Sequence, residues 1–124
     1  MKRMVFEGWL LLLYFDCVMC LGDFMRLHKI VRERKVCRTR TTSLTSEQLC
    51  HAVDLACVFY FKPVLCLQRS AATAILMRRY GWHAEMVLGA QMLPFLSHAW
   101  VEVDGLVVND KPYIGELFQE LDRC

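Results

Sequence analysis

Three side chains in the second half of the chain have types and positions suited to nucleophilic catalysis. Cys66 opens a segment of helix-forming residues, where free N–H groups and the helix dipole favour a thiolate. A thiolate needs a base, and His98 stands in an alternating, strand-like stretch further along the chain. Asp110 ends the next such stretch and is suited to orienting the imidazole. These residues predict a Cys-His-Asp site; the alternative is that Cys66 is a small core residue and His98 has no catalytic role.

The turn before Asp110 decides which residue joins His98. Asp104-Gly105 is a strong hairpin signal between two predicted strands. A two-residue turn puts Asn109 on the sheet face of His98 and sends Asp110 to the other face. A three-residue turn with a glycine bulge shifts the register by one residue and sets Asp110 opposite His98. The spacing alone leaves Asn109 and Asp110 open as the orienting residue.

Helices precede this site along the chain. Apolar periodicity predicts helix over residues 4–35, with a break at Gly22-Asp23. Thr45 and Gln48 have the spacing of a capping box that starts a second helix, and Pro63 makes its continuation unfavourable. Leu44 and Leu49, which flank the box, have the spacing of a hydrophobic staple.

The second half of the chain changes from helical to strand periodicity. A third helix is predicted over residues 66–80, with Gly81 as its left-handed cap. Strands follow in the stretches "HAEMVLGA", "SHAWVEV" and "LVVND". The order of helices first and an antiparallel sheet second predicts an α+β fold, in which the helix that begins at Cys66 packs on a small sheet.

The composition is that of one folded domain with a large core. The 124 residues have a mass of 14.5 kDa and are 56% hydrophobic. The formal net charge is +2, but residues 26–40 hold seven Lys or Arg against one acid. Such a segment attracts acidic peptides or lipid headgroups, or is a solvated surface. Because no aromatic residue interleaves with these cations to stack on bases, we predict no nucleic-acid partner.

The cysteines and the apolar N-terminus indicate in which cellular compartment the protein is expected. Seven irregularly spaced cysteines predict a reducing cytoplasm rather than a disulfide framework. The first apolar run resembles a signal peptide, but Glu7 and Asp16 bracket it and no small-residue cleavage site follows. The run is shorter than the ~20 residues that span a bilayer. It therefore predicts a buried or membrane-touching helix, and membrane contact stays open.

Four residues near Cys66 and His98 are candidates for supporting roles. The backbone N–H of Cys66 is a natural oxyanion donor, and Gln68 is a second candidate, although its position favours solvent exposure. We expect an ion pair between helix and sheet, and a tryptophan buried in the core with its strand face against the helix. The ion pair would join Arg69 to Glu102, and the tryptophan is Trp100.

Other groups of potential ligands are weaker. Cys17 and Cys20 have CxxC spacing, but no second pair follows and the surrounding helix is apolar. His83 and Glu85 share a strand face without further ligands. We therefore predict neither a metal nor a cofactor.

The motifs around the three side chains resemble a known family. "CLQRS", "RRYGWHAEMVLG" and "SHAWVEVDGLVVND" are similar to the leader peptidases of lasso-peptide biosynthesis, the maturation protein B family of papain-like or transglutaminase-like cysteine proteases. The similarity spans residues 63–110, with Ser97 where alanine usually precedes the histidine. Carried over position by position, it implies Cys66 as nucleophile, His98 as base and Asp110 as orienting acid.

The resemblance also implies an architecture, a reaction and partners. Residues 1–45 would be a helical scaffold with the basic segment, and residues 46–124 a cysteine protease core within a single domain. The expected reaction frees the core of a lasso-peptide precursor from its leader. Expected partners are the leader region of the precursor, a separate leader-binding protein (a RiPP recognition element) and an ATP-dependent lasso cyclase. Two alternatives stay open: transglutaminase-type acyl transfer to an amine, and a non-catalytic interaction module.

Overall fold

Two helices begin the chain in the computed structural model, which describes residues 2–36, 45–92 and 95–124. Helix α1 spans Lys2–Leu21 and α2 spans Phe24–Glu33. Asp23 caps α2, because its carboxylate accepts a hydrogen bond of 3.0 Å from the backbone N–H of Arg26. The break predicted at Gly22-Asp23 is therefore confirmed.

Helix α1 corrects one expectation about the apolar N-terminus. Its 20 residues are long and apolar enough to cross a membrane, by a criterion that buried core helices and signal sequences also meet. The expectation that the run is too short to span a bilayer is therefore wrong. Leu12 and Phe15 are fully buried against the rest of the protein, whereas Phe6 and Leu21 are exposed.

Helix α3 spans Ser46–Val58 and starts as the capping box predicts. Thr45 Oγ1 accepts from the backbone N–H of Gln48 at 3.2 Å, and the backbone N–H of Thr45 donates to Gln48 Oε1 at 3.0 Å. The predicted hydrophobic staple involves Leu44, which lies outside the described residues. The helix ends before Pro63, as expected.

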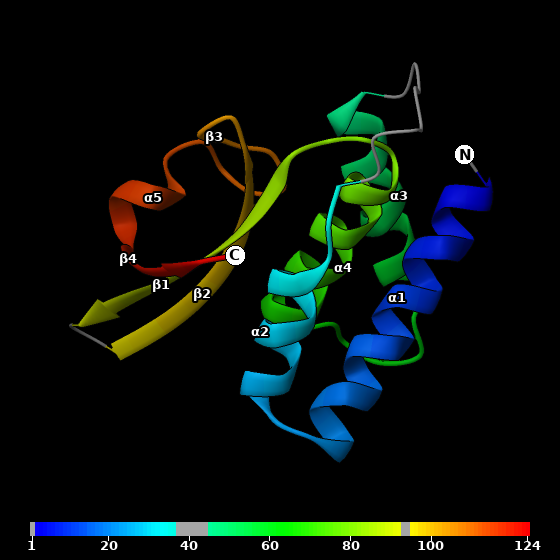
Figure 1. The fold of residues 1–124 in the computed structure, drawn as a ribbon, viewed down its shortest axis with the longest axis horizontal. Helices are drawn as coiled ribbons and strands as arrows, with labels where there is room; N and C mark the ends of the chain where they lie inside the picture. The colour runs from blue at the N-terminus through cyan, green and yellow to red at the C-terminus, as the bar shows by residue number, and fades with distance from the viewer. Residues whose placement is uncertain (1, 37–44, 93–94) are drawn as a thin grey trace.

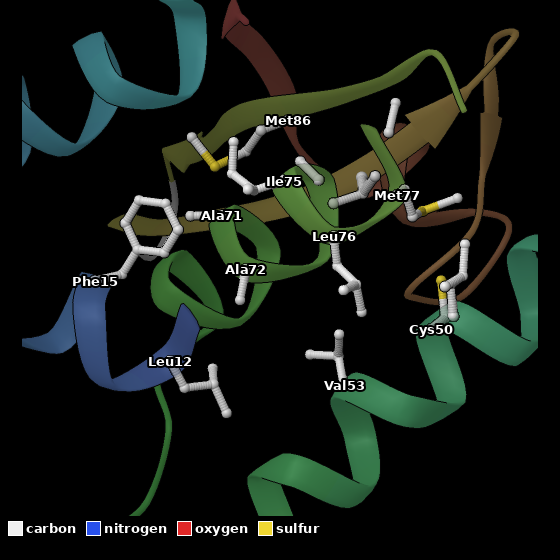
Figure 2. Close-up of a cluster of buried hydrophobic side chains, with 14 of the residues drawn as sticks. Leu12, Phe15, Cys50, Val53, Ala71, Ala72, Ile75, Leu76, Met77 and Met86 are labelled. Atoms are coloured by element: carbon white, nitrogen blue, oxygen red, sulfur yellow. The ribbon is translucent and has the colours of Figure 1, made fainter. Parts of the chain in front are cut away.

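Helix α4 spans Cys66–Arg79 and forms the middle of the molecule, with α1 and α3 on one side and the sheet on the other (Figure 1). It is buried on nearly every side after its first two residues. Its small buried residues Ala71, Ala72 and Ala74 let the neighbouring elements approach the helix closely. Ile75 and Leu76 fill the space on opposite sides of the helix (Figure 2). Gly81 follows with φ of +92°, which confirms the left-handed cap.

The sheet has four antiparallel strands in the order β3-β2-β1-β4 (Figure 1). The strands are β1 (Ala84–Met92), β2 (Phe95–Val103), β3 (Leu106–Val107) and β4 (Gln119–Arg123). A short helix, α5 (Ile114–Leu117), precedes β4. The α+β fold is thus confirmed, while α5 and β4 are additions that the strand pattern did not predict. β4 pairs with β1, so the end of the chain completes the sheet.

The two faces of the sheet bury different side chains. Met86 and Val101 are paired across β1 and β2 and pack in the main core with the helices. Val87 and Trp100 are paired on the opposite face, where Ile114 of α5 covers them. Trp100 is buried, with 1% exposure, but not against α4. The expectation that its face covers the helix is wrong, because strand alternation turns Trp100 and Val101 to opposite sides.

Candidate active site

Cys66 is the first residue of α4 and its thiol is half-buried. The residue before it, Leu65, makes no side-chain cap, so the N–H groups of the first turn are left to other acceptors. Two other cysteines are less suited to nucleophilic attack. Burial raises the pKa of Cys50 to about 12 and that of Cys124 to about 11, which keeps both thiols protonated at neutral pH.

His98 is held by Asp110. The imidazole Nε2 lies 2.5 Å from Asp110 Oδ2, and the backbone N–H of Lys111 donates to Asp110 Oδ1 at 2.7 Å. Burial alone would raise the pKa of Asp110, but these hydrogen bonds and the nearby positive charges outweigh it and lower the pKa. An ionised Asp110 keeps the proton of the neutral imidazole on Nε2. Nδ1 is then the nitrogen that can accept a proton.

Aromatic rings fix the plane of the imidazole. The ring of Phe118 stacks on His98 with centroids 5.3 Å apart, and Trp100 lies 6.1 Å away in a similar orientation. Trp100 Nε1 donates to Glu102 Oε2 at 2.8 Å. Gly89 pairs with His98 across the two strands. A Cβ at this position would lie 2.7 Å from the Trp100 ring, so only glycine fits there without a shift of the ring. The Trp100 ring beside the imidazole is thus itself held in place.

Asn109 has a structural role that differs from the role of its neighbour Asp110. Its Oδ1 accepts from the backbone N–H of Val101 at 2.7 Å, and its Nδ2 donates to Ser70 Oγ at 3.2 Å. The Ser70 hydroxyl donates in turn to the carbonyl of Ala99 at 3.0 Å. Asn109 is 7% exposed and joins α4 to β2 on the helix side of the sheet. Both polar atoms of its side chain are thus engaged by groups other than His98.

The turn explains how Asp110 reaches His98. Asp104 and Gly105 have φ of +52° and +80°, and Val103 pairs with Leu106, as in a two-residue turn. The prediction that this turn sends Asp110 to the wrong face is wrong, because it assumed that the strand pairing continues. The strand pairing ends at Val107, one further backbone hydrogen bond runs from the N–H of Val108 to the carbonyl of Val101, and the chain then bends.

Arg69 and Glu102 have partners other than those expected. Arg69 Nε donates to Asp54 of α3 at 3.1 Å, and its Nη2 donates to the carbonyl of Asn109 at 2.7 Å. Glu102 pairs with Arg123 of β4 at 3.1 Å. The expected Arg69–Glu102 ion pair is therefore wrong, because Glu102 shares the sheet face of Trp100, away from α4. Arg69 instead holds the segment that carries Asp110.

Cys66 and His98 line one cavity of about 360 Å³. Its other walls are mostly apolar and come from α2, α4, β1, β2 and β4: Phe24, Leu67, Leu88, Gly89, Ser97, Ala99, Leu121 and Asp122. No hydrogen bond joins the thiol to the imidazole in the described part of the chain. Such contacts often form only when substrate binds. The structure thus places Cys66 and His98 in the wall of one cavity, with Asp110 bound to the imidazole.

Gln68 lies elsewhere. It is 7% exposed, so the expectation that it faces solvent is wrong. It lines a separate cavity of about 200 Å³ together with Asp16, Tyr60 and Lys62, and its Oε1 is buried without a hydrogen-bond partner.

The remaining candidate ligands are apart from the site. Glu85 is 3.4 Å from Arg123, and Cys17 and Cys20 are exposed on α1. Among residues 2–36, 45–92 and 95–124, no three His, Cys, Asp or Glu side chains gather as a metal site would require.

Sequence reasoning missed Phe118 as a neighbour of His98. Ile114 and Phe118 are four residues apart, and both bury their side chains on the outer face of the sheet. That spacing after Pro112 was the one signal for a helical turn there.

Comparisons with known proteins agree with this geometry. A family model described as the transglutaminase-like superfamily matches residues 9–122. The chain belongs to this superfamily. Members of the transglutaminase-like superfamily are typically cysteine-dependent enzymes, in keeping with a cavity lined by Cys66 and His98.

A curated relative gives a more specific similarity. The microcin J25-processing protein McjB of Escherichia coli is 43% identical over 47 residues. The alignment covers 38% of this chain and 23% of the relative, so the chain spans much less than two thirds of that protein. Together with the superfamily match, it confirms the resemblance to the maturation protein B family. No solved structure matches the chain significantly.

Proposed function

We propose that this protein is a cysteine peptidase that removes the leader from a ribosomally made lasso-peptide precursor. The observation that carries the proposal is the cavity lined by both Cys66 and His98, with the imidazole held by an ionised Asp110. The similarity to the microcin J25-processing protein supports a peptide precursor as substrate.

The first half of the proposed reaction forms an acyl-enzyme. His98 Nδ1 takes the proton of the Cys66 thiol, and the sulfur attacks the carbonyl carbon at the leader-core junction. The backbone N–H of Cys66 donates to the oxyanion that develops. The protonated imidazole then gives its proton to the departing nitrogen, the C–N bond breaks, and the core peptide leaves with a free amine. The leader stays bound to sulfur as a thioester.

Water completes the reaction. It loses a proton to His98 Nδ1 while its oxygen attacks the thioester carbonyl. The C–S bond then breaks, the proton returns to sulfur through the imidazole, and the leader leaves as a carboxylic acid. Asp110 stabilises the imidazolium that forms in both halves.

The product of this reaction and the resemblance to the maturation protein B family suggest the setting. A separate ATP-dependent lasso cyclase would join the freed amine to a side-chain carboxylate of the core. A separate leader-binding protein would present the precursor. Six cysteines in the described part of the chain are free thiols, which supports a reducing cytoplasm as the compartment.

The deciding experiment mixes the full chain with the precursor peptide encoded beside it and the leader-binding protein, and reads fragment masses. We expect cleavage at one defined bond by the wild type and none by Cys66→Ala. Asn109→Gln, which alters a buried structural contact, controls for general damage, because its folded fraction should still cut. Equal cleavage by wild type and Cys66→Ala, or none by either, would reject the proposal.

Superfamily membership favours one second function, acyl transfer to an amine. It uses the same thioester, which an amine attacks in place of water. Adding a primary amine in excess distinguishes the two, because transfer yields a conjugate whose mass exceeds that of the hydrolysed product.

A further inference from the structure

One side of α2 carries a row of exposed cations. Arg26, Lys29 and Arg32 are three residues apart, so they follow one side of the helix, while Leu27 and Val31 bury the other. None of the three cations forms an ion pair with a residue in 2–36, 45–92 or 95–124. Their charges are therefore available to a ligand.

These cations line a groove that adjoins the catalytic cavity. The groove has a volume of about 410 Å³, and its walls include Arg26, Lys29 and Arg32. Phe24 and Asp122 belong to its walls and also to those of the cavity with Cys66 and His98. A peptide that leaves the catalytic cavity past Phe24 and Asp122 therefore enters the cationic groove.

The positive potential extends beyond this groove. Arg32 also lines a wider groove of about 920 Å³, together with Arg34 and Lys35. The acid at the junction, Asp122, lies 3.0 Å from Nε2 of the buried His28, although the geometry is not that of a hydrogen bond. Three cations against this one carboxylate still leave the lining of the groove with excess positive charge.

The length of α2 sets the distance of the charges from the cut bond. Phe24 and Arg32 are about 12 Å apart along the axis at ~1.5 Å per residue. An extended peptide covers this distance with about four residues at ~3.3 Å each. A few more residues occupy the catalytic cavity itself, so the groove meets substrate residues within about eight positions of the cleaved bond.

We infer that the α2 groove binds an acidic stretch of the substrate peptide and so determines which peptides are cut. The inference rests on the proposed function. Charge complementarity selects carboxylates, and continuity with a cavity that holds a nucleophile selects a peptide over an anionic membrane surface. Because the groove is away from the reacting bond, it should act on KM and leave kcat unchanged.

The test compares two synthetic peptides that span the leader-core junction and differ only in four Glu or four Gln residues within this stretch. We expect the wild type to cut the Glu peptide with roughly tenfold higher kcat/KM at low salt, through KM. Arg26→Glu/Lys29→Glu should abolish this preference. The matched control, Lys2→Glu/Arg3→Glu on α1, makes the same change in net charge away from the groove and should keep it. Circular dichroism checks folding, and an independent readout is the rise in KM of the wild type for the Glu peptide alone as salt increases.

Several outcomes would overturn the inference. An unchanged preference in the α2 variant, or an equal loss in the α1 control, removes the groove from specificity. The inference also fails if the Arg26→Glu/Lys29→Glu variant keeps the peptide kinetics of the wild type but no longer sediments with phosphatidylserine vesicles. That result would favour a lipid surface as the ligand of the groove. If the wild type cuts both peptides equally, the inference fails and the peptidase stands. If it cuts neither and behaves as Cys66→Ala, both proposals fail.

Discussion

Replacing Asp110 with asparagine tests the proposed chemistry most directly. The change keeps the shape of the side chain and an oxygen for the backbone N–H of Lys111. It removes the charge that lies 2.5 Å from His98 Nε2. An amide that donates to Nε2 would move the imidazole proton to Nδ1. A protonated Nδ1 could then not accept the proton of the Cys66 thiol. We therefore expect folded but nearly inactive protein.

The size of the loss can be bounded. In the serine-protease triad, the same replacement lowers kcat about 10⁴-fold, because the histidine is held in the wrong tautomer. At 1.36 kcal/mol per factor of ten, this corresponds to about 5 kcal/mol of lost transition-state stabilisation. The short hydrogen bond and the limited exposure of both side chains in this protein indicate a loss of about 10²–10⁴-fold.

Asn109→Ala is the matched comparison, because the two positions are adjacent in the chain. It leaves the buried backbone N–H of Val101 without an acceptor and removes the hydrogen bond that Ser70 Oγ accepts, which costs about 2–4 kcal/mol of folding free energy. The melting temperature should fall by roughly 10 °C, while the folded fraction keeps its kcat/KM. Single-turnover cleavage measured by mass spectrometry, with thermal melts by circular dichroism, separates the two effects. The reasoning is refuted if Asp110→Asn retains wild-type turnover, or if Asn109→Ala loses turnover without losing stability.

Three further outcomes follow from the described contacts. Gln68→Leu should raise the melting temperature by a few degrees, since it removes a buried carbonyl that has no partner; a lower melting temperature would argue that the amide is satisfied. Gly89→Ala should lower both stability, by about 1–3 kcal/mol, and kcat/KM, because its Cβ would displace the rings of Trp100 and Phe118 beside the imidazole; wild-type values for both would contradict this packing. The lowered pKa of Asp110 stabilises the folded state at neutral pH, and this contribution is lost as the pH falls through the folded pKa. Urea midpoints between about pH 6 and pH 3 should therefore fall more steeply for wild type than for Asp110→Asn, and parallel curves would deny the shift.

The sequence predicted the elements whose signals are local. A capping box lies within four residues, and the cap at Gly81 depends on one backbone angle. The hairpin turn at Asp104-Gly105 is equally local, because both of its residues adopt positive φ. Each of these signals is readable without knowledge of distant contacts.

Features that depend on distant parts of the chain were not predictable in this way. The face of Trp100 depends on which side α4 covers, and alternation alone does not identify that side. The partner of Arg69 depends on where α3 lies, because Asp54 reaches it from a separate helix. Extrapolated strand pairing misplaced Asp110, since the position where pairing stops is set by contacts of Asn109 with α4 and β2.

Strand β4 is short, but its place in the sheet makes it important for the candidate site. β4 forms one edge beside β1, and the ring that stacks on the imidazole precedes β4 directly. A nascent chain that has released residues 1–110 from the ribosome already contains the sulfur, the base and the acid. It still lacks the edge strand and the aromatic cover. The site is therefore complete only once residues up to Arg123 have left the ribosome, and loss of β4 should be far more harmful than the solvent exposure of its residues suggests.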